Sequence, residues 1–311
     1  NKKLISVVQH SIMRASRVGS RAFVEFQPCQ QHRATVLRAT PLGFCRHWTY
    51  RTPIALIRAH GGHRTSMQSI HVTPAQHTSV SAASGVPPEV ATVFKTADAI
   101  CFDVDSTFCE DESIDELAAF IGVGEAIATM TAQAMGGVVT FQESLAARLG
   151  IMSPSAQIVE EFLSSHPPRI SPGIPEIIAY CQSQGIQVFL VSGGFHQIID
   201  PIAAMLGIPS NHVFANRILY NAAGSYAGFD PTCFTSRSGG KREAVQHLRA
   251  TRGLQRVVMV GDGATDAEAK APGGADVFVG YGGVVRRPAV EARADWYITD
   301  LRDLLAALQR A

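Results

Sequence analysis

Short apolar runs alternate with longer amphipathic segments over the part of the chain that follows residue 88. The runs occupy residues 99–102, 188–191, 257–260, 277–279 and 296–299. Continuous apolar runs of this length are typical of strands buried on both faces, and helical segments between them are typical of βαβ units. The pattern predicts an α/β fold with a Rossmann-like parallel sheet that helices cover on both sides.

The segment 113–168 departs from this alternation, because its apolar positions follow a helical period and no strand-like run interrupts them. Ser113 and Glu116 have the spacing of a capping box, which predicts that a helix begins there. An insert that directly follows the first strand of a parallel sheet lies near the carboxyl ends of the strands, where ligands bind. We therefore expect a small helical cap over about residues 113–168, placed as a lid.

Charge is distributed unevenly along the chain. Of 27 basic residues, 11 precede Pro87, whereas Glu25 is the only one of 26 acidic residues that does so. The remainder carries 16 basic and 25 acidic residues and a net charge of −9. A leader rich in arginine and nearly free of acids is typical of an organelle transit peptide. The acidic remainder argues against a nucleic-acid partner.

Residues 1–87 are accordingly expected to be a transit peptide and linker that is cleaved or lacks fixed structure, with the folded domain over residues 88–311. The Ser, Ala, Gly and Pro residues of 77–88 mark the linker. A plastid address is favoured over a mitochondrial one, and a leader without an address is the alternative. No apolar stretch approaches the roughly 18–20 residues of a membrane-spanning helix, so no membrane association is expected.

Acidic residues follow two of the predicted strands. Asp103 and Asp105 come directly after the first run, and Asp262 and Asp266 follow the run at 257–260. Because ligands of open α/β sheets sit at the carboxyl ends of the strands, these side chains are expected to share one site. Paired carboxylates can hold Mg²⁺ or divide the roles of nucleophile and general acid. The six cysteines show no CxxC pair and no metal-ligand spacing with histidine, which argues against zinc.

Two further motifs favour an anion site. Ser192, Gly193 and Gly194 follow an apolar run and precede a helical pattern, which predicts N–H groups and a hydroxyl at a helix N-terminus. Lys241 opens the next helical pattern and can hold phosphate as a point charge. Neither a Walker A loop nor a GxGxxG motif is complete. Taken alone, the Ser-Gly-Gly motif is about as well explained by an ordinary glycine turn, and a lysine such as Lys241 is more often a solvated surface residue.

In combination these motifs resemble the haloacid dehalogenase-like superfamily, which carries Asp-x-Asp, a strand-end Ser or Thr, a downstream Lys and a final acidic motif. The matching positions, in that order, are Asp103, Asp105, Ser192, Lys241, Asp262 and Asp266. Longer stretches such as CFDVDST, VFLVSGGF, SGGK, GDGATD and WYITD are similar to the phosphoserine phosphatase family within it. The resemblance covers about residues 88–311 and implies a C1-type cap inserted after the first core strand.

The resemblance implies a Mg²⁺-dependent phosphoric monoester hydrolase that converts O-phospho-L-serine to L-serine and phosphate, the last step of the phosphorylated serine biosynthesis pathway. Asp103 would attack phosphorus to form an aspartyl-phosphate, and Asp105 would serve as general acid and then as general base. Mg²⁺ would be held by Asp103, by the backbone carbonyl of Asp105 and by Asp262, with Asp266 orienting a water ligand.

The resemblance also implies the contacts of the substrate. The residues assigned to it in this way are Glu112, Met135, Phe141, Arg148, Ser192, Gly193, Gly194, Lys241 and Thr265. Glu112 would bind the ammonium group and Arg148 the carboxylate, while Met135 and Phe141 would exclude water. Without the resemblance, Arg148 would be interpreted as a helix-surface cation and Phe141 as a core residue of the insert.

Two alternatives stay open. A related phosphatase or phosphotransferase would act on another small phosphoester, such as a phosphohomoserine-type or sugar-phosphate substrate, but Glu112 would repel a dianion that lacks an ammonium group. A binding-only homologue would hold a phosphorylated ligand without turnover, and the presence of both Asp103 and Asp105 argues against it. The sequence leaves the assembly state open, a homodimer included.

Overall fold

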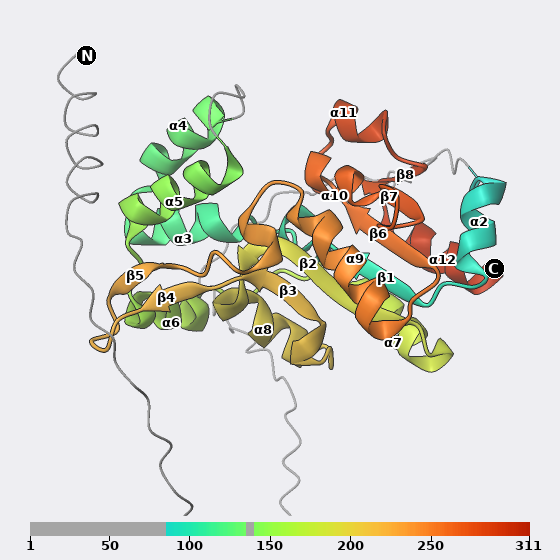
Figure 1. Cartoon of the computed structure of the whole chain (residues 1–311), viewed down its shortest axis with the longest axis horizontal. Helices are drawn as coiled ribbons and strands as arrows, with labels where there is room; N and C mark the ends of the chain where they lie inside the picture. Colours follow the sequence, from blue (N-terminus) through green and yellow to red (C-terminus); the bar gives the residue numbers. More distant parts are fainter. Residues whose placement is uncertain (1–84, 135–139) are drawn as a thin grey trace, which may run out of the picture. The chain divides into compact units, whose positions relative to one another are not determined.

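A six-stranded parallel sheet forms the centre of the computed structural model, which describes residues 85–134 and 140–311 (Figure 1). The strands are β1 (Ala99–Phe102), β2 (Gln187–Phe195), β3 (Val213–Asn216), β6 (Val257–Gly261), β7 (Val277–Tyr281) and β8 (Trp296–Ile298). Their order is β3-β2-β1-β6-β7-β8, and each pair of neighbours is parallel. The predicted α/β fold with a Rossmann-like parallel sheet is confirmed.

Helices cover both faces of this sheet because its strands are apolar on both sides. Alternate residues of β1 belong to opposite cores, with Ile100 and Phe102 in one and Ala99 and Cys101 in the other. The first core includes buried residues of α2 (Pro88–Phe94), α7 (Ile174–Gln184), α8 (His196–Met205) and α12 (Leu301–Arg310). The second includes residues of α9 (Gly240–Arg252), α10 (Ala264–Ala269) and α11 (Pro288–Glu291). Burial on both faces explains why these strands are continuous apolar runs.

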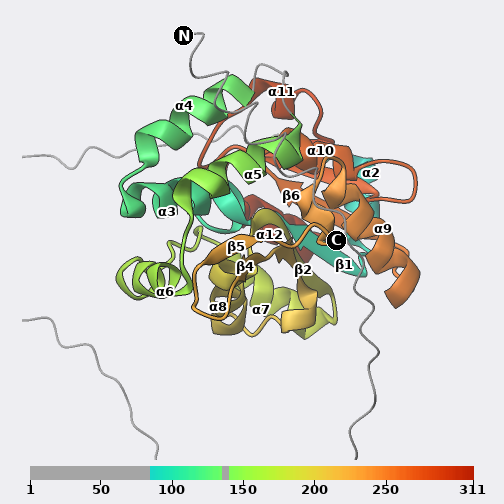
Figure 2. The ribbon, with the colours of Figure 1, turned by 60° about the vertical axis from the view of Figure 1, so that its left-hand side comes forward.

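Helices also fill the segment between β1 and α7. A short turn of helix, η1 (Val104–Phe108), leads into α3 (Ser113–Ile121), α4 (Gly124–Ala134), α5 (Phe141–Met152) and α6 (Ala156–Ser165). The helices α3, α4 and α5 lie together in Figures 1 and 2. The two ends of the segment meet where Cys109 and Ile170 form an antiparallel bridge. The insert is therefore joined to the sheet by two adjacent linkers.

The start of α3 differs from the prediction. Its N-cap is Glu112, and no side chain of the expected capping box caps the helix. Instead the Oδ1 atom of Asp105 accepts a hydrogen bond from the Ser113 N–H at 3.0 Å. A residue delivered by the sheet edge thus takes the place of a local cap. A capping box is instead formed by Thr140 and Glu143 at α5.

Three strands were not predicted from the sequence. β3 is short, and β4 (Ile218–Tyr220) and β5 (Tyr226–Phe229) form an antiparallel hairpin with partly exposed residues. None of these segments has a continuous apolar run like that of β1. Within the described residues, no helix has the length and apolar character needed to span a bilayer.

Candidate active site

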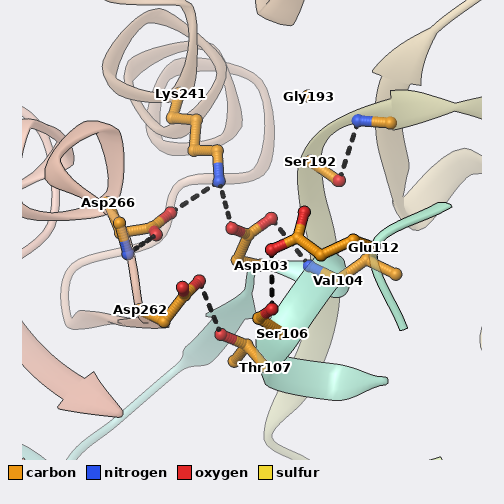
Figure 3. Close-up of polar contacts among 12 residues, drawn as sticks. Asp103, Val104, Ser106, Thr107, Glu112, Ser192, Gly193, Lys241, Asp262 and Asp266 are labelled. Atoms are coloured by element: carbon orange, nitrogen blue, oxygen red, sulfur yellow. Dashed lines mark hydrogen bonds and ion pairs between the residues drawn. The ribbon is translucent and has the colours of Figure 1, made fainter. Parts of the chain in front are cut away.

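The carboxyl ends of three neighbouring strands deliver the predicted polar residues to one place. Phe102 of β1 lies in register with Leu190 of β2 and with Val260 of β6. Asp103 follows Phe102 directly, and its N–H donates to the Val260 carbonyl at 2.9 Å. Ser192 and Asp262 therefore emerge beside Asp103 on either side (Figure 3).

A cavity of about 500 Å³ opens at this edge. Its lining includes the predicted residues Asp103, Asp105, Glu112, Phe141, Gly193, Lys241, Asp262 and Thr265. The side chains come from the ends of β1 and β6, from the insert and from the start of α9 and α10. Most of the residues proposed from the sequence thus surround one space large enough for a small phosphoester.

Three buried carboxylates gather at this edge of the sheet, two of them lining the cavity. Asp103, Asp262 and Asp266 each place one oxygen within 4.8 Å of the others. Burial, followed by the charge of Asp103, raises the pKa of Asp262 to about 6 and also raises that of Asp266. Like charges in so small a buried volume call for a cation. Buried carboxylate oxygens are the ligands that Mg²⁺ prefers, so the cluster fits this ion.

Lys241 supplies one cation to this cluster. Its Nζ atom lies 2.8 Å from Asp103 Oδ2 and 2.6 Å from Asp266 Oδ1, and the residue is only 7% exposed. Burial alone would lower the pKa of the Lys241 ammonium, but the carboxylates of Asp103 and Asp266 outweigh burial and raise it. Lys241 is therefore a buried charged group and not the surface lysine of the alternative interpretation.

Asp105 and Glu112 are oriented by the turn that follows β1. Ser106 has φ of +53°, a left-handed conformation that is uncommon for a residue with a side chain. Its hydroxyl donates to Glu112 Oε1 at 2.7 Å, which holds this carboxylate at the cavity. Burial, and then the charge of Asp103, raises the pKa of Asp105 to about 7. A carboxyl group of this kind can carry a proton near neutral pH.

Arg287 connects the cluster of three carboxylates with Glu112, although no sequence motif marks it as a site residue. Its Nε atom donates to Asp262 Oδ2 at 2.9 Å, and its NH2 atom lies 3.7 Å from Glu112 Oε1. The other oxygen of Asp262 accepts from Thr107 at 3.3 Å. Arg287 follows β7 in a segment without a recognised motif, so only the fold shows its position.

The glycine-rich segment of β2 is placed differently from the prediction. Ser192, Gly193 and Gly194 belong to the strand itself, because β2 continues to Phe195 and α8 begins only at His196. The prediction of a helix N-terminus at these residues is therefore wrong. Ser192 is buried, and its hydroxyl accepts from the Gly194 N–H at 3.0 Å. Of the three, Gly193 lines the cavity.

A buried amide that sequence reasoning missed fixes this segment. The side chain of Asn216 at the end of β3 donates to the Gly193 carbonyl at 2.8 Å and accepts from Thr235 Oγ1 at 3.1 Å. Thr235 itself lines the cavity, as does Glu268 of α10. Because both the nitrogen and the oxygen of its amide are hydrogen bonded, this buried asparagine links β2 to the loop that leads to Lys241.

The remaining predicted substrate residues are only partly assembled. Phe141 begins α5 and faces Gly193, whereas Arg148 lies on the same helix but does not line the cavity. The Nε atom of Arg148 donates to the Ser144 carbonyl within α5 at 3.4 Å. Met135 lies outside the described residues.

The backbone of Gly261 passes so close to Asp266 that a Cβ atom there would overlap the Asp266 carboxyl group. We expect Gly261→Ala to displace Asp266 and to lower the free energy of unfolding by about 1–3 kcal/mol, the usual cost of overpacking. Gly150→Ala in α5, where a Cβ atom would meet nothing within 4 Å, is the matched control and should not destabilise the fold. Urea unfolding of both variants measures the difference. Equal stability of the two would contradict the tight packing at Gly261.

Comparison with known proteins agrees with this geometry. Residues 97–274 match the haloacid dehalogenase-like hydrolase family. The chain is 51% identical over 220 residues to the chloroplastic phosphoserine phosphatase of Arabidopsis thaliana, which covers 71% of this chain and 75% of that protein. It is 49% identical over 221 residues to the phosphoserine phosphatase of Bos taurus, covering 71% of this chain and 97% of that one.

Solved structures show the same architecture. A phosphoserine phosphatase structure with an analogue of its phospho-aspartyl intermediate has a TM-score of 0.57 and 28% identity, covering 68% of this chain and 98% of that one. The order of the strands, the cluster of acids with its buried lysine and the extent of identity lead to one assignment. The chain belongs to the phosphoserine phosphatase family of the haloacid dehalogenase-like hydrolases.

Proposed function

We propose that this protein hydrolyses O-phospho-L-serine to L-serine and phosphate by way of an aspartyl-phosphate on Asp103. The observation that carries the proposal is the position of Asp103, whose carboxylate lies in the cavity, paired with Lys241 and flanked by a second carboxyl group, Asp105. Release of free serine from its phosphate ester is the last step of the phosphorylated route to serine, and the enzyme catalyses this step.

In the first half-reaction a carboxylate oxygen of Asp103 attacks phosphorus while the bond from phosphorus to the serine oxygen breaks. Both oxygens of this carboxylate are held in place, since Asp103 Oδ1 accepts from the Val104 N–H at 2.7 Å and Oδ2 contacts Lys241. Lys241 offsets the repulsion between this carboxylate and the phosphate dianion. Ser192, Gly193, Gly194 and Thr265 bind the remaining phosphate oxygens.

Asp105 moves the proton in both half-reactions. Its raised pKa keeps a proton available near neutral pH, which it gives to the departing serine oxygen. It then takes a proton from the water that attacks phosphorus, and the bond to Asp103 breaks to release phosphate. The hydrogen bond from the Ser113 N–H to Oδ1 fixes the orientation of this carboxyl group throughout.

Mg²⁺ would be held by Asp103, Asp262 and the backbone carbonyl of Asp105, with Asp266 orienting a water ligand. When bound, this ion neutralises charge on the phosphate and the carboxylates during transfer. Thr107 and the Gly263 N–H, which contact Asp262 and Asp266, keep the two carboxylates turned toward the cluster.

Glu112 binds the substrate ammonium group, and Phe141 and Met135 exclude water from the reacting groups. Arg148 receives the substrate carboxylate. Because Arg148 does not line the cavity, this role requires its side chain to turn away from the Ser144 carbonyl and toward the substrate.

Chemical trapping tests the covalent step. Enzyme quenched during turnover of phosphoserine labelled on phosphorus should carry label that hydroxylamine removes, as expected for an acyl phosphate. The label should be absent from Asp103→Asn. Label that persists in this variant would place the nucleophile elsewhere.

Replacement of Glu112 tests the choice of substrate. We expect Glu112→Gln to lower kcat/KM for phosphoserine by about 10- to 100-fold, the worth of a charge-assisted hydrogen bond. The kcat/KM for 3-phosphoglycerate, which has a hydroxyl in place of the ammonium group, should not fall. Steady-state kinetics with both substrates make the comparison. An equal fall for both would show that Glu112 supports the site without reading the ammonium group.

Two adjacent arginines provide a matched pair of variants. Arg287 contacts Asp262 and Glu112, whereas Arg286 pairs with Glu291 on the surface. We expect Arg287→Ala to lower kcat/KM for phosphoserine by about tenfold, because two site carboxylates lose a shared partner. Arg286→Ala should stay within about twofold, as for an exposed ion pair. The same kinetic assay decides, and equal effects of the two would exclude a role for Arg287.

The protein also has features of a plastid enzyme. Residues 1–87 contain 11 basic residues and a single acid, and one matched relative is a chloroplastic enzyme. Residues 1–87 fused to a fluorescent protein should accumulate in plastids. Accumulation in mitochondria or in the cytosol would overturn this address.

A further inference from the structure

A second cavity of about 290 Å³ lies between α6 of the insert and α8 beside the sheet. We call it the hinge cavity. On one wall it is lined by Ile198, Ile202 and Met205 of α8, and on the other by Phe162, Leu163 and His166 at the end of α6. The two helices lie side by side in Figures 1 and 2. The cavity therefore has one wall on the insert and one on the sheet domain.

Both linkers of the insert run along this cavity. Cys109 of the outgoing linker and Pro167 and Pro168 of the returning one are among its lining residues. The linkers are hydrogen bonded to each other, with the Glu110 N–H donating to the Arg169 carbonyl at 2.8 Å. A molecule in the hinge cavity would consequently contact both linkers as well as both walls. Its presence would fix the separation of α6 and α8.

The charged groups that line the hinge cavity are carboxylates. Asp105, Asp111 and Glu116 contribute to its surface, and among the described residues that line it there is neither lysine nor arginine. Arg169 binds Asp111 through its backbone N–H and its Nε atom, and its NH2 atom lies 3.3 Å from Glu116, but the Arg169 side chain is 61% exposed. The cavity is thus an apolar volume bordered by acidic side chains.

Aromatic faces add to this preference. Phe162 and His166 are stacked with their ring centroids 4.8 Å apart, and both line the cavity. The face of an aromatic ring attracts an organic cation, most strongly where water is excluded. The carboxylates of Asp111 and Glu116, beside stacked rings and aliphatic side chains, are complementary to an amine that carries an apolar group.

We propose that the hinge cavity binds a small organic cation, a primary amine attached to a single ring or a short branched chain. Bound there, the ligand contacts both α6 and α8 and restricts the movement of the insert relative to the sheet. It lowers turnover without competing with the substrate at the active site. This effect on turnover rests on the proposed function, whereas binding itself does not.

Binding of 2-phenylethylamine to the full chain, measured without substrate by calorimetry, tests the proposal. The expected result is saturable binding with a Kd of about 1 mM or tighter, a reasonable range for so small a molecule. Phenylacetate, which has the opposite charge on a similar body, should bind at least tenfold more weakly. Equal binding of the two, or no binding of the amine, would overturn the proposal.

Variants locate the site. Met205→Trp narrows the cavity from its exposed rim and should weaken amine binding at least fivefold, while Ala204→Trp on the solvent side of the same helix should not. Glu116→Gln should weaken binding of the amine and leave the neutral 2-phenylethanol unaffected. A crystal structure with the amine bound should place it between α6 and α8. Binding in the active-site cavity, or unchanged binding in both Met205→Trp and Glu116→Gln, would overturn the assignment.

Inhibition is then measured separately. The amine should lower kcat for phosphoserine and leave KM within about twofold. Competitive inhibition would contradict binding between α6 and α8. If phosphoserine is not turned over at all, the proposed function fails while the binding result still stands or falls on its own.

Discussion

Asp103→Asn should abolish phosphate release from phosphoserine, with kcat lower by at least about 1,000-fold. The amide is nearly the same size as the carboxylate but cannot serve as the nucleophile, so no covalent intermediate forms. The fold should survive, because the change removes one of three buried acids that repel one another. Phosphate release and thermal unfolding of the purified variant measure the two effects.

Asp111→Asn is a suitable control for this substitution. Asp111 is an acid of the same turn region, but its carboxylate is bonded to Arg169 at the linkers and does not line the active-site cavity. Its activity should stay within about threefold of the unaltered protein. If Asp103→Asn retained a tenth of the activity, direct attack by Asp103 would be wrong.

Lys241→Met is expected to damage both activity and stability. The substitution keeps an unbranched side chain of similar length but leaves Asp103 and Asp266 without their buried ammonium partner. Breaking a buried ion pair from one side costs about 3–5 kcal/mol of unfolding free energy. The loss of charge beside the phosphate should lower kcat/KM by about 100-fold or more. Urea unfolding and kinetics measure these effects.

Lys270→Met provides the contrast. Lys270 pairs with Asp295, but its side chain is 41% exposed, and surface pairs contribute about 0–1 kcal/mol. Added Mg²⁺ should restore part of the stability of Lys241→Met, since a second cation can reach the same acids, and should not change that of Lys270→Met. Equal unfolding midpoints of the two lysine variants would show that Lys241 is not the charge partner described here.

Much of the fold was predictable because the central strands are buried on both faces. β1, β6 and β7 are apolar runs, and the acids that follow β1 and β6 necessarily lie near each other once the sheet is parallel. β3 was missed because it is short and ends in Asn216, whose polar side chain interrupts the apolar pattern. That residue is buried only because Gly193 and Thr235 satisfy its amide, a condition that no local pattern contains.

The unpredicted parts of the site depend on contacts between distant segments. Serine is a common helix N-cap, yet here the Ser113 N–H donates a hydrogen bond to Asp105, which lies at the edge of the sheet. Arg287 is 25 residues beyond Asp262 and reaches it only through the path of the chain after β7. Arg148 lies in a helix of the insert, as expected, but its side chain does not line the cavity. Sequence spacing does not determine how far α5 lies from the sheet.

Phosphate release from a panel of phosphoesters distinguishes the proposed substrate from its alternatives. The full chain is assayed with L-phosphoserine, D-phosphoserine, phosphothreonine, phosphohomoserine and sugar phosphates, each with Mg²⁺ or with EDTA. We predict rapid release from L-phosphoserine that requires Mg²⁺ and much slower release from the others. A higher kcat/KM for another phosphoester, or equal release in EDTA, would contradict it.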